Sequence, residues 1–196
     1  DGSAVRITVA RSYTPSGRCI QKPYERGNSS DYESDILNRY LHGEFFSKDS
    51  IHQTDTMAYK TVGGRTVYGG GGIMPDVFVP RDTIGFTPYF NALANGGHIY
   101  QYALLFTEKE RAKLSTYKDW KTLSAYLDTQ NLQASFDTYA SAKGVKGSAR
   151  DKAVSEDIIT RQLKSYVLRT MLGDAGFFPY LNSYDMTVKK AVEKLK

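Results

Sequence analysis

Hydrophobic and polar residues alternate with a period of two near the start of the chain. Val5, Ile7 and Val9 occupy every second position, and polar or small residues stand between them. Alternation that uses β-branched residues is typical of a strand with one apolar face, so it predicts a β-strand over Val5–Arg11. Because the chain begins beside this strand-like segment, we expect it to be a piece of a longer protein.

A turn and a short second strand follow. Tyr13–Gly17 reads YTPSG, in which Pro15 presets one backbone angle and Gly17 supplies a flexible last residue. The alternation resumes over Arg18–Gln21 and predicts a second strand there. We therefore expect residues 1–21 to form a strand–turn–strand unit.

Four consecutive glycines, Gly69–Gly72, separate two further segments of strand-like composition. Thr66–Tyr68 precedes them, and Val77–Val79 follows. Glycine accepts positive φ, so the run predicts a sharp backbone corner between two strands. A phosphate-binding loop is the functional alternative. That loop ends in Lys-Ser/Thr and opens a helix, whereas here a strand is expected next.

The residues between these two regions predict a helix and a hairpin. Asp31–Phe46 places apolar residues at helical spacing, and Gly43 is expected to end the helix. The members of the apolar stripe are Tyr32, Ile36, Leu37 and Tyr40. Farther on, Ala58–Val62 and Arg65–Tyr68 predict a hairpin that turns at Gly63 and Gly64.

Helical periodicity replaces alternation after Pro80. It predicts helices at 88–94, 98–106, 117–127 and 150–172, a short helix from Leu132 to Gly144, and a last helix from Ser183 or Asp185 to Lys196. Thr107 and Thr116 are expected to be N-caps. The expected core face of the longest helix consists of Val154, Ile158, Leu163, Val167 and Met171.

Composition and charge narrow the function classes. The chain has 196 residues and a net charge of +5, and its Lys and Arg residues are dispersed rather than clustered, which argues against nucleic acid as a partner. Its 15 tyrosines against one tryptophan suit half-buried positions and interfaces. No apolar run approaches the roughly 20 residues that span a bilayer.

Few residues suggest chemistry on their own. Cys19 alternates with polar neighbours, and we interpret it as a structural thiol rather than a nucleophile. His42 and His52 lie among acidic residues, but they lack the close pairing of common metal motifs. We therefore expect no metal site and no cofactor.

Two motifs together resemble a known family. GSAVRITVARSYTPSGRCIQ followed by GGIMPDVFVP is similar to the C-terminal processing (tail-specific) serine peptidases, which are Ser–Lys peptidases that usually carry a PDZ domain. The matching residues are Gly2, Ser3, Ala4, Ile7, Thr8, Ala10, Arg11, Tyr13–Gly17, Arg18, Ile20, Gln21, Gly72, Ile73, Pro75, Asp76, Val77 and Val79. Ser12 departs from the aromatic residue that is usual in the family. The two motifs cover about a fifth of the chain.

The resemblance implies that the reacting groups lie elsewhere. In this family the nucleophilic serine, its lysine base and an assisting glutamine precede the GSA segment, so they are expected upstream of Asp1. Ser3 is expected at the start of a strand and Ser16 in a turn, and no lysine of this chain matches the family motif. Because a serine nucleophile needs its base within hydrogen-bond reach, we assign no catalytic residue.

The expected fold is α+β. Residues 1–80 are expected to be the last strands of a peptidase catalytic domain with an insertion at about 22–65, and residues 81–196 a helical region. The resemblance implies a secreted or periplasmic endopeptidase that cuts proteins near their C-termini, with membrane attachment through a missing N-terminal segment left open. Its partners would be protein or peptide substrates.

The alternative is a non-catalytic interaction or oligomerisation module, whose exposed surface would include Tyr100, Tyr102, Trp120, Tyr126 and Tyr139. A core role for the same aromatic side chains is the competing interpretation. Strands taken from a larger sheet have unpaired edges, so self-association through Val5–Arg11 or Thr66–Val79 is also expected.

Overall fold

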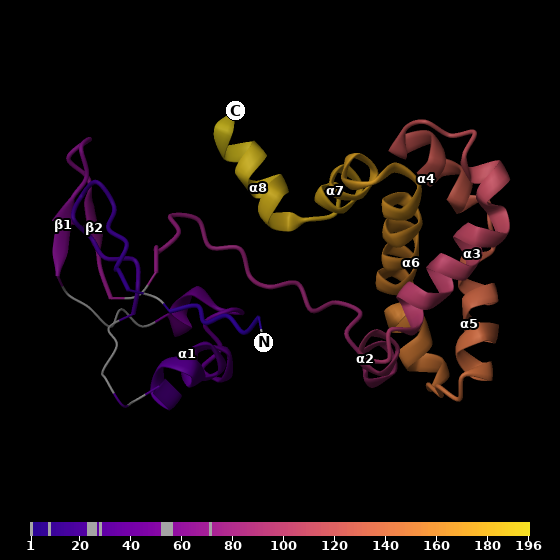
Figure 1. Cartoon of the computed structure of the whole chain (residues 1–196), viewed down its shortest axis with the longest axis horizontal. Coiled ribbons are helices and arrows are strands. Elements are labelled where there is room, and N and C mark those ends of the chain that lie inside the picture. The colour runs from indigo at the N-terminus through magenta and orange to yellow at the C-terminus, as the bar shows by residue number, and fades with distance from the viewer. Residues whose placement is uncertain (1, 8, 23–26, 28, 52–56, 71) are drawn as a thin grey trace. The chain divides into compact units, whose positions relative to one another are not determined.

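The computed structural model describes residues 2–7, 9–22, 27, 29–51, 57–70 and 72–196 (Figure 1). The chain divides into two compact units, Asp1–Arg81 (unit 1) and Asp82–Lys196 (unit 2). This boundary falls next to Pro80, where the sequence pattern changes from alternation to helical periodicity. Each unit is described by itself.

Among its described residues, unit 1 contains one α-helix, one short 3₁₀ helix and one hairpin. These elements are α1 (Ser29–Leu41), η1 (Lys48–Ser50), β1 (Ala58–Lys60) and β2 (Thr66–Tyr68). The predicted hairpin is confirmed, because β1 and β2 pair antiparallel and place Tyr59 opposite Val67. The predicted end of α1 at Gly43 is also confirmed. Gly43 has a φ of +81°, and Glu44 N–H donates to the Arg39 carbonyl.

Two of the predicted strands are absent from the described residues. Val5–Arg11 forms no strand, and Val5, Ile7 and Val9 are 84%, 72% and 91% exposed. Val77–Val79 forms no strand either, and Arg18–Gln21 contributes only an isolated bridge between Tyr13 and Cys19. These predictions were wrong because a strand needs a paired neighbour, which an alternating sequence cannot supply by itself.

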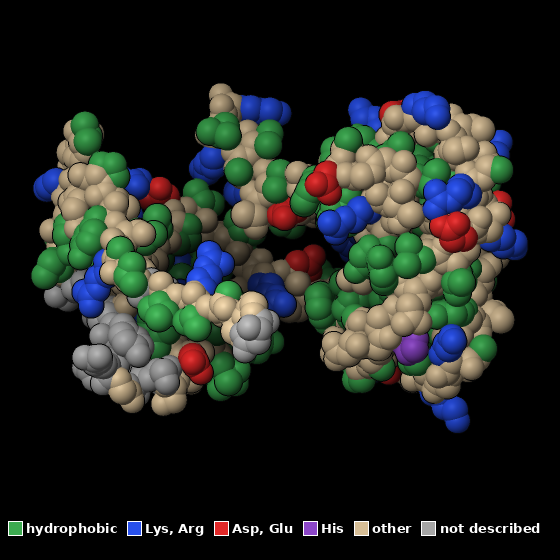
Figure 2. Space-filling view, in the orientation of Figure 1, with side chains coloured by type: hydrophobic (Ala, Val, Ile, Leu, Met, Phe, Trp, Pro, Cys, Tyr) green, Lys and Arg blue, Asp and Glu red, His purple; other side chains and the backbone are tan. Residues whose placement is uncertain are grey.

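Unit 1 has no buried apolar cluster among its described residues. The predicted stripe on α1 exists, but Tyr32, Ile36, Leu37 and Tyr40 are all exposed. Among the described residues of unit 1, Arg18 alone is buried. Figure 2 accordingly shows hydrophobic side chains on the surface of unit 1.

Unit 2 is a bundle of helices. Its members are α2 (Pro88–Asn95), α3 (His98–Leu114), α4 (Trp120–Asp128), α5 (Leu132–Ala142), α6 (Ala149–Leu172), α7 (Asp174–Asn182) and α8 (Met186–Leu195). The predicted positions of most of these helices are confirmed to within a few residues. α3, however, continues through Thr107 to Leu114 as one helix.

The long helix α6 organises the bundle. It packs against α2, α3, α4, α5 and α7, which surround it in Figure 1. The buried core comprises Tyr89, Phe90, Leu93, Ile99, Ala103, Leu114, Leu123, Leu127, Leu132, Phe136, Ala140, Ile159, Leu163, Val167, Leu168 and Tyr180. A single helix thus contacts nearly every other helix of the unit.

The core face of α6 is rotated from the predicted one. Leu163 and Val167 are buried as expected, but Val154 is exposed, and Ile159 rather than Ile158 is fully buried. The prediction weighted hydrophobic residues only. The buried face also includes the polar residues Ser155 and Lys164, which have partners inside the bundle.

Two predicted caps are also wrong. Thr107 lies inside α3, and its buried hydroxyl donates to the Ala103 carbonyl at 2.7 Å, so it satisfies itself within the helix. Asp119 rather than Thr116 caps α4, where its carboxylate accepts from the N–H groups of Lys121 and Thr122.

At the coarse level the predicted α+β class is correct, because a mostly helical chain carries one small antiparallel sheet. Across the described residues, we find no helix whose length and apolarity would let it cross a lipid bilayer.

Candidate functional site: the Arg18 junction

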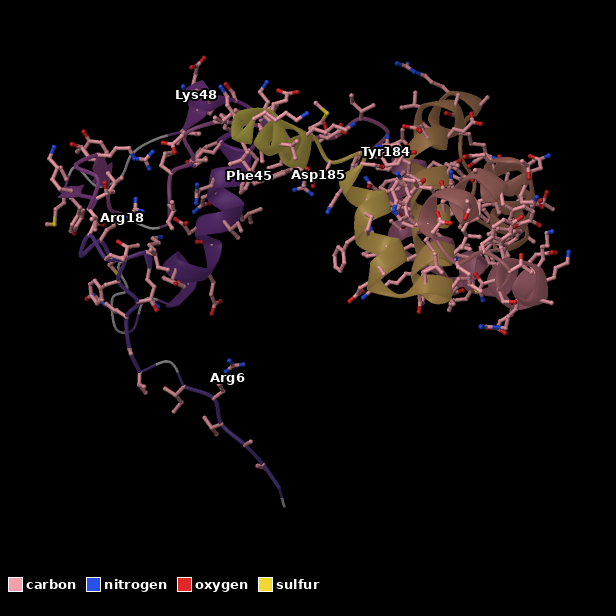
Figure 3. The ribbon with its side chains drawn as sticks, turned by 90° about the horizontal axis from the view of Figure 1, so that it is seen from above. Arg6, Arg18, Phe45, Lys48, Tyr184 and Asp185 are labelled. Carbon is pink, nitrogen blue, oxygen red and sulfur yellow. The ribbon has the colours of Figure 1, made fainter. Side chains whose placement is uncertain are left out.

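Arg18, in the first motif, contacts strand β2 just ahead of the second motif. Its Nη1 donates to the Tyr68 carbonyl at 3.1 Å, across 50 residues of sequence. The Arg18 side chain is only 7% exposed, although arginine is almost never buried without a partner. Figure 3 labels Arg18 at this position in unit 1. We call the contact between residues 13–21 and 66–72 the Arg18 junction.

The glycine corner completes this junction through its backbone. Gly72 N–H donates to the Ile20 carbonyl at 2.7 Å, and Gly69 N–H donates to the Met57 carbonyl at 3.3 Å. Gly70 and Gly72 both have a φ of +97°, which a residue with a Cβ rarely adopts. The predicted backbone corner is therefore confirmed at these two glycines, while Gly71 lies outside the described residues.

The turn before Arg18 fixes where its side chain starts. Gly17 N–H donates to the Thr14 carbonyl, and Thr14 N–H donates to the Arg18 carbonyl, both at 2.9 Å. Gly17 has a φ of +81°, as the turn requires. The predicted turn is thus confirmed, and it holds Arg18 beside β2.

One donor of the junction remains without an acceptor. Arg18 Nε is buried and has no hydrogen-bond partner in the described part of the chain. Leaving a buried donor unpaired costs about 1–3 kcal/mol.

Ser3 and Ser16 both lie in the first motif. Ser3 is exposed and stands two residues before Val5. Ser16 shares a 2.8 Å hydrogen bond with the Thr14 hydroxyl, which is not a proton acceptor of the strength that nucleophilic catalysis requires.

In unit 1 the structure describes His42 and Cys19. His42 is exposed, and His52 lies outside the described residues. No group of three or more His, Cys, Asp and Glu side chains that could hold a metal ion occurs among the described residues. Cys19 is a half-buried free thiol in the turn region.

A second polar cluster, in unit 2, escaped the sequence reasoning. The Lys164 ammonium on α6 donates to Asp128 at the end of α4, at 2.7 Å, and its side chain is 4% exposed. The same ammonium lies 5.4 Å from the centre of the Tyr180 ring. Only the placement of Lys164 on the buried face of α6 could have revealed this cluster, and the hydrophobic pattern does not contain that information.

The electrostatics of this cluster are those of a structural site. Burial, and then the hydrogen bond with Tyr184, raise the pKa of the Tyr180 hydroxyl above its ordinary value. Arg161 lies over the Tyr184 ring at 5.1 Å and pairs with Asp157. These contacts fasten the end of α7 to α6, and they present no nucleophile next to a base.

The aromatic residues considered for an interaction surface lie mainly against the core. Tyr102, Trp120, Tyr126 and Tyr139 are half-buried and pack against it, whereas Tyr100 is 50% exposed. Four of the five side chains therefore stabilise the bundle and are not free to form a continuous docking patch.

Comparison with known proteins finds a family model that matches part of the chain. Residues 89–173, which run from α2 to the end of α6, match a family of unknown function, DUF8443. No curated protein and no solved structure matches the chain. The matched residues lie in unit 2 and leave both motif segments of unit 1 outside the match.

Proposed function

We propose that unit 1 is part of the scaffold of a C-terminal processing serine peptidase of the Ser–Lys type. The observation that carries this proposal is the Arg18 junction. There Gly72 N–H of the second motif donates to the Ile20 carbonyl of the first, and the buried Arg18 of the first motif donates to the Tyr68 carbonyl just ahead of the second. Segments so far apart in sequence would have no need of a specific buried contact if each were an independent loop.

In this proposal the reacting serine and lysine come from outside these 196 residues. The lysine would take the proton from the serine hydroxyl, the serine oxygen would attack a substrate carbonyl, and backbone N–H groups would hold the oxyanion. Unit 1 would position the strands that carry those groups. A secreted or periplasmic location belongs to the same proposal.

The exposed N-terminal segment supports this scaffold role. Figure 3 shows Arg6 on an extended stretch with no strand beside it. Val5, Ile7 and Val9 leave apolar side chains uncovered, and the described residues of this stretch belong to no strand. A sheet supplied by the rest of the peptidase would pair the edge and cover the face.

The test compares this protein with a longer polypeptide that extends upstream of Asp1 in its gene. Both are incubated with an unfolded protein that has an apolar C-terminus, and cleavage is followed by mass spectrometry. We expect the longer form to cut and the 196-residue protein to remain inactive. Cleavage by the short form after removal of contaminating proteases would contradict the proposal, and so would an inactive long form.

A second candidate function has an observation of its own. The exposed stripe on α1 favours a non-catalytic oligomerisation module, because Ile36 and Leu37 are 68% and 56% exposed on a regular helix. If α1 is the contact, Ile36→Glu should convert an oligomer into a monomer in sedimentation velocity. If instead the chains associate by pairing the backbone of the segment Val5–Arg11, Ile7→Pro should produce the monomer, because proline removes a backbone donor.

A further inference from the structure

The C-terminal helix α8 is a well-formed helix that no other helix covers. Asp185 caps it, and its carboxylate accepts from Thr187 N–H at 2.7 Å and from Val188 N–H at 3.1 Å. No residue of α8 is buried, and among the described helices none packs extensively against it. A strong cap therefore starts a helix whose faces remain open to a partner.

One face of α8 is apolar. Val188, Ala191, Val192 and Leu195 recur at the spacing that places residues on one side of a helix. Val192 is 48% exposed and Leu195 is 87% exposed. The stripe is narrow and made of short aliphatic side chains, without a large aromatic residue to fill a pocket.

Lysines border this apolar stripe on both sides. At 3.6 residues per turn, Lys189 falls along one border and Lys194 along the other, while Lys190 lies farther round on the polar side. Glu193 lies on the opposite, polar side, where it pairs with Lys190 at 2.8 Å. Figure 2 shows basic and hydrophobic side chains together on α8.

We propose that α8 binds the surface of an anionic lipid bilayer, lying flat with its apolar stripe among the acyl chains. Lysine stems on both borders can extend sideways and place their ammonium groups at the level of the phosphate headgroups. Binding in an acidic groove of a protein would need large aromatic side chains on α8 to fill pockets of the groove, and α8 has none. Binding to a planar bilayer needs lysines on both borders of the apolar stripe, as α8 has. A helix of ten residues is about 15 Å long, half of the hydrocarbon thickness, so it lies on the bilayer and does not cross it.

The helix is attached firmly enough to bring unit 2 with it. Tyr184 and Asp185 join α7 to α8, as labelled in Figure 3. The Tyr184 ring contacts the Tyr180 ring at 5.2 Å, and the Arg161 guanidinium lies over it. Binding through α8 would thus hold the bundle close to the membrane. This inference does not depend on the peptidase proposal.

The test is co-sedimentation of the full 196-residue protein with two kinds of vesicle. One kind is pure phosphatidylcholine, and the other contains equal parts of phosphatidylcholine and phosphatidylglycerol. We expect at least about tenfold stronger binding to the anionic vesicles, weakening as salt is added, because juxtamembrane lysines are attracted to anionic lipid.

Two variants separate the two contributions. Replacing Lys189, Lys190 and Lys194 by glutamine should abolish the preference for anionic vesicles, and Leu195→Asp should weaken binding to them at low salt. The matched control replaces three exposed lysines elsewhere in unit 2 by glutamine, namely Lys109, Lys118 and Lys146. It should bind anionic vesicles as strongly as the wild type does. Circular dichroism checks that every variant remains folded.

Three results would overturn the proposal. They are equal binding to neutral and anionic vesicles, loss of binding in the control to the same extent as in the α8 lysine variant, and no binding to either vesicle. Binding of a polyglutamate peptide through the α8 lysines, without vesicle binding, would instead assign the surface to an acidic protein.

Discussion

Arg18 illustrates what a single residue adds to the sequence motif that contains it. The resemblance identifies the position, but an arginine between a turn and a strand is ordinarily expected at the surface. The structure buries it against the Tyr68 carbonyl. Its role depends on a contact across 50 residues, which no local pattern encodes.

We predict that Arg18→Met loosens the Arg18 junction. Loss of a hydrogen bond from a charged donor should cost about 1.5–3 kcal/mol locally. Hydrogen exchange should therefore accelerate at the amides of Thr66–Tyr68 and at Gly72. Arg65→Met is the matched control, because Arg65 forms an exposed ion pair with Asp76, and such pairs contribute about 0–1 kcal/mol. Equal acceleration in both variants would refute the special role of Arg18.

Tyr89 is a second residue whose environment changes its chemistry. Burial of the ring, followed by the charge of Asp137 and the hydrogen bond with it, raises the pKa of Tyr89 from 10.0 to about 12. The folded state therefore keeps this proton at pH values where the unfolded chain releases it.

The sign of the pH dependence follows directly. Below pH 10 both states are protonated and the full stability is present, and between pH 10 and about 12 only the unfolded state loses the proton, so the free energy of unfolding falls. We predict that Tyr89→Phe makes this fall shallower in urea denaturation measured across that range. Tyr100→Phe, which alters a half-exposed ring, should keep the wild-type slope.

At the scale of elements, the helices could be predicted and most of the strands could not. A helix satisfies its own backbone, so periodicity and caps suffice to locate it. A strand depends on a neighbour, which explains why Val5–Arg11 and Val77–Val79 remain unpaired while the local hairpin of β1 and β2 forms.

The helix α7 is the one that the pattern missed, because Gly176 and Pro179 resemble helix breakers. Its formation depends on tertiary packing. A Cβ at Gly176 would lie 2.9 Å from the Leu168 carbonyl oxygen, so only glycine allows α7 to approach α6 this closely. Tyr180, next to the proline, is buried in the core.

A chain of buried hydroxyl groups fixes the start of the bundle. Ser155 on α6 donates to the Gly85 carbonyl at 2.8 Å, and its oxygen accepts from the Thr87 hydroxyl at 2.7 Å. The Thr87 oxygen in turn accepts from Phe90 N–H and caps α2. One side chain of α6 therefore holds both the segment before α2 and its cap.

We predict that Ser155→Ala destabilises unit 2 by about 1–3 kcal/mol, because it leaves the buried Gly85 carbonyl without its donor. Chemical denaturation followed by circular dichroism measures this loss. Ser141→Ala, at an exposed position of α5, is the control and should change stability by no more than about 0.5 kcal/mol.

At the scale of the whole molecule, the buried core belongs to one unit. All buried hydrophobic residues among those described lie between Tyr89 and Tyr180, and none lies in unit 1. The resemblance rests on two motifs of unit 1 and the family match on residues 89–173 of unit 2, so the two sources of information do not overlap. The charged cluster around Lys164 lies within the matched residues, but the matched family has no known function to assign to it.

We predict that limited proteolysis of the full protein cuts first within residues 1–81. A stable fragment beginning near Asp82 should accumulate, because cleavage follows local opening and the packed helices open least. Mass spectrometry over a time course identifies the cuts. Early cleavage between α3 and α6 would contradict this order.

The missing core of unit 1 has a thermodynamic consequence. A unit that buries no apolar cluster of its own gains stability only from what binds its folded form, by an amount that grows with the logarithm of the partner's concentration. If unit 1 is the peptidase scaffold that we propose, its folding and its association with the rest of that domain form one equilibrium. The folded fraction of residues 1–81 would then rise with the supply of the partner sheet, while unit 2 remained folded throughout.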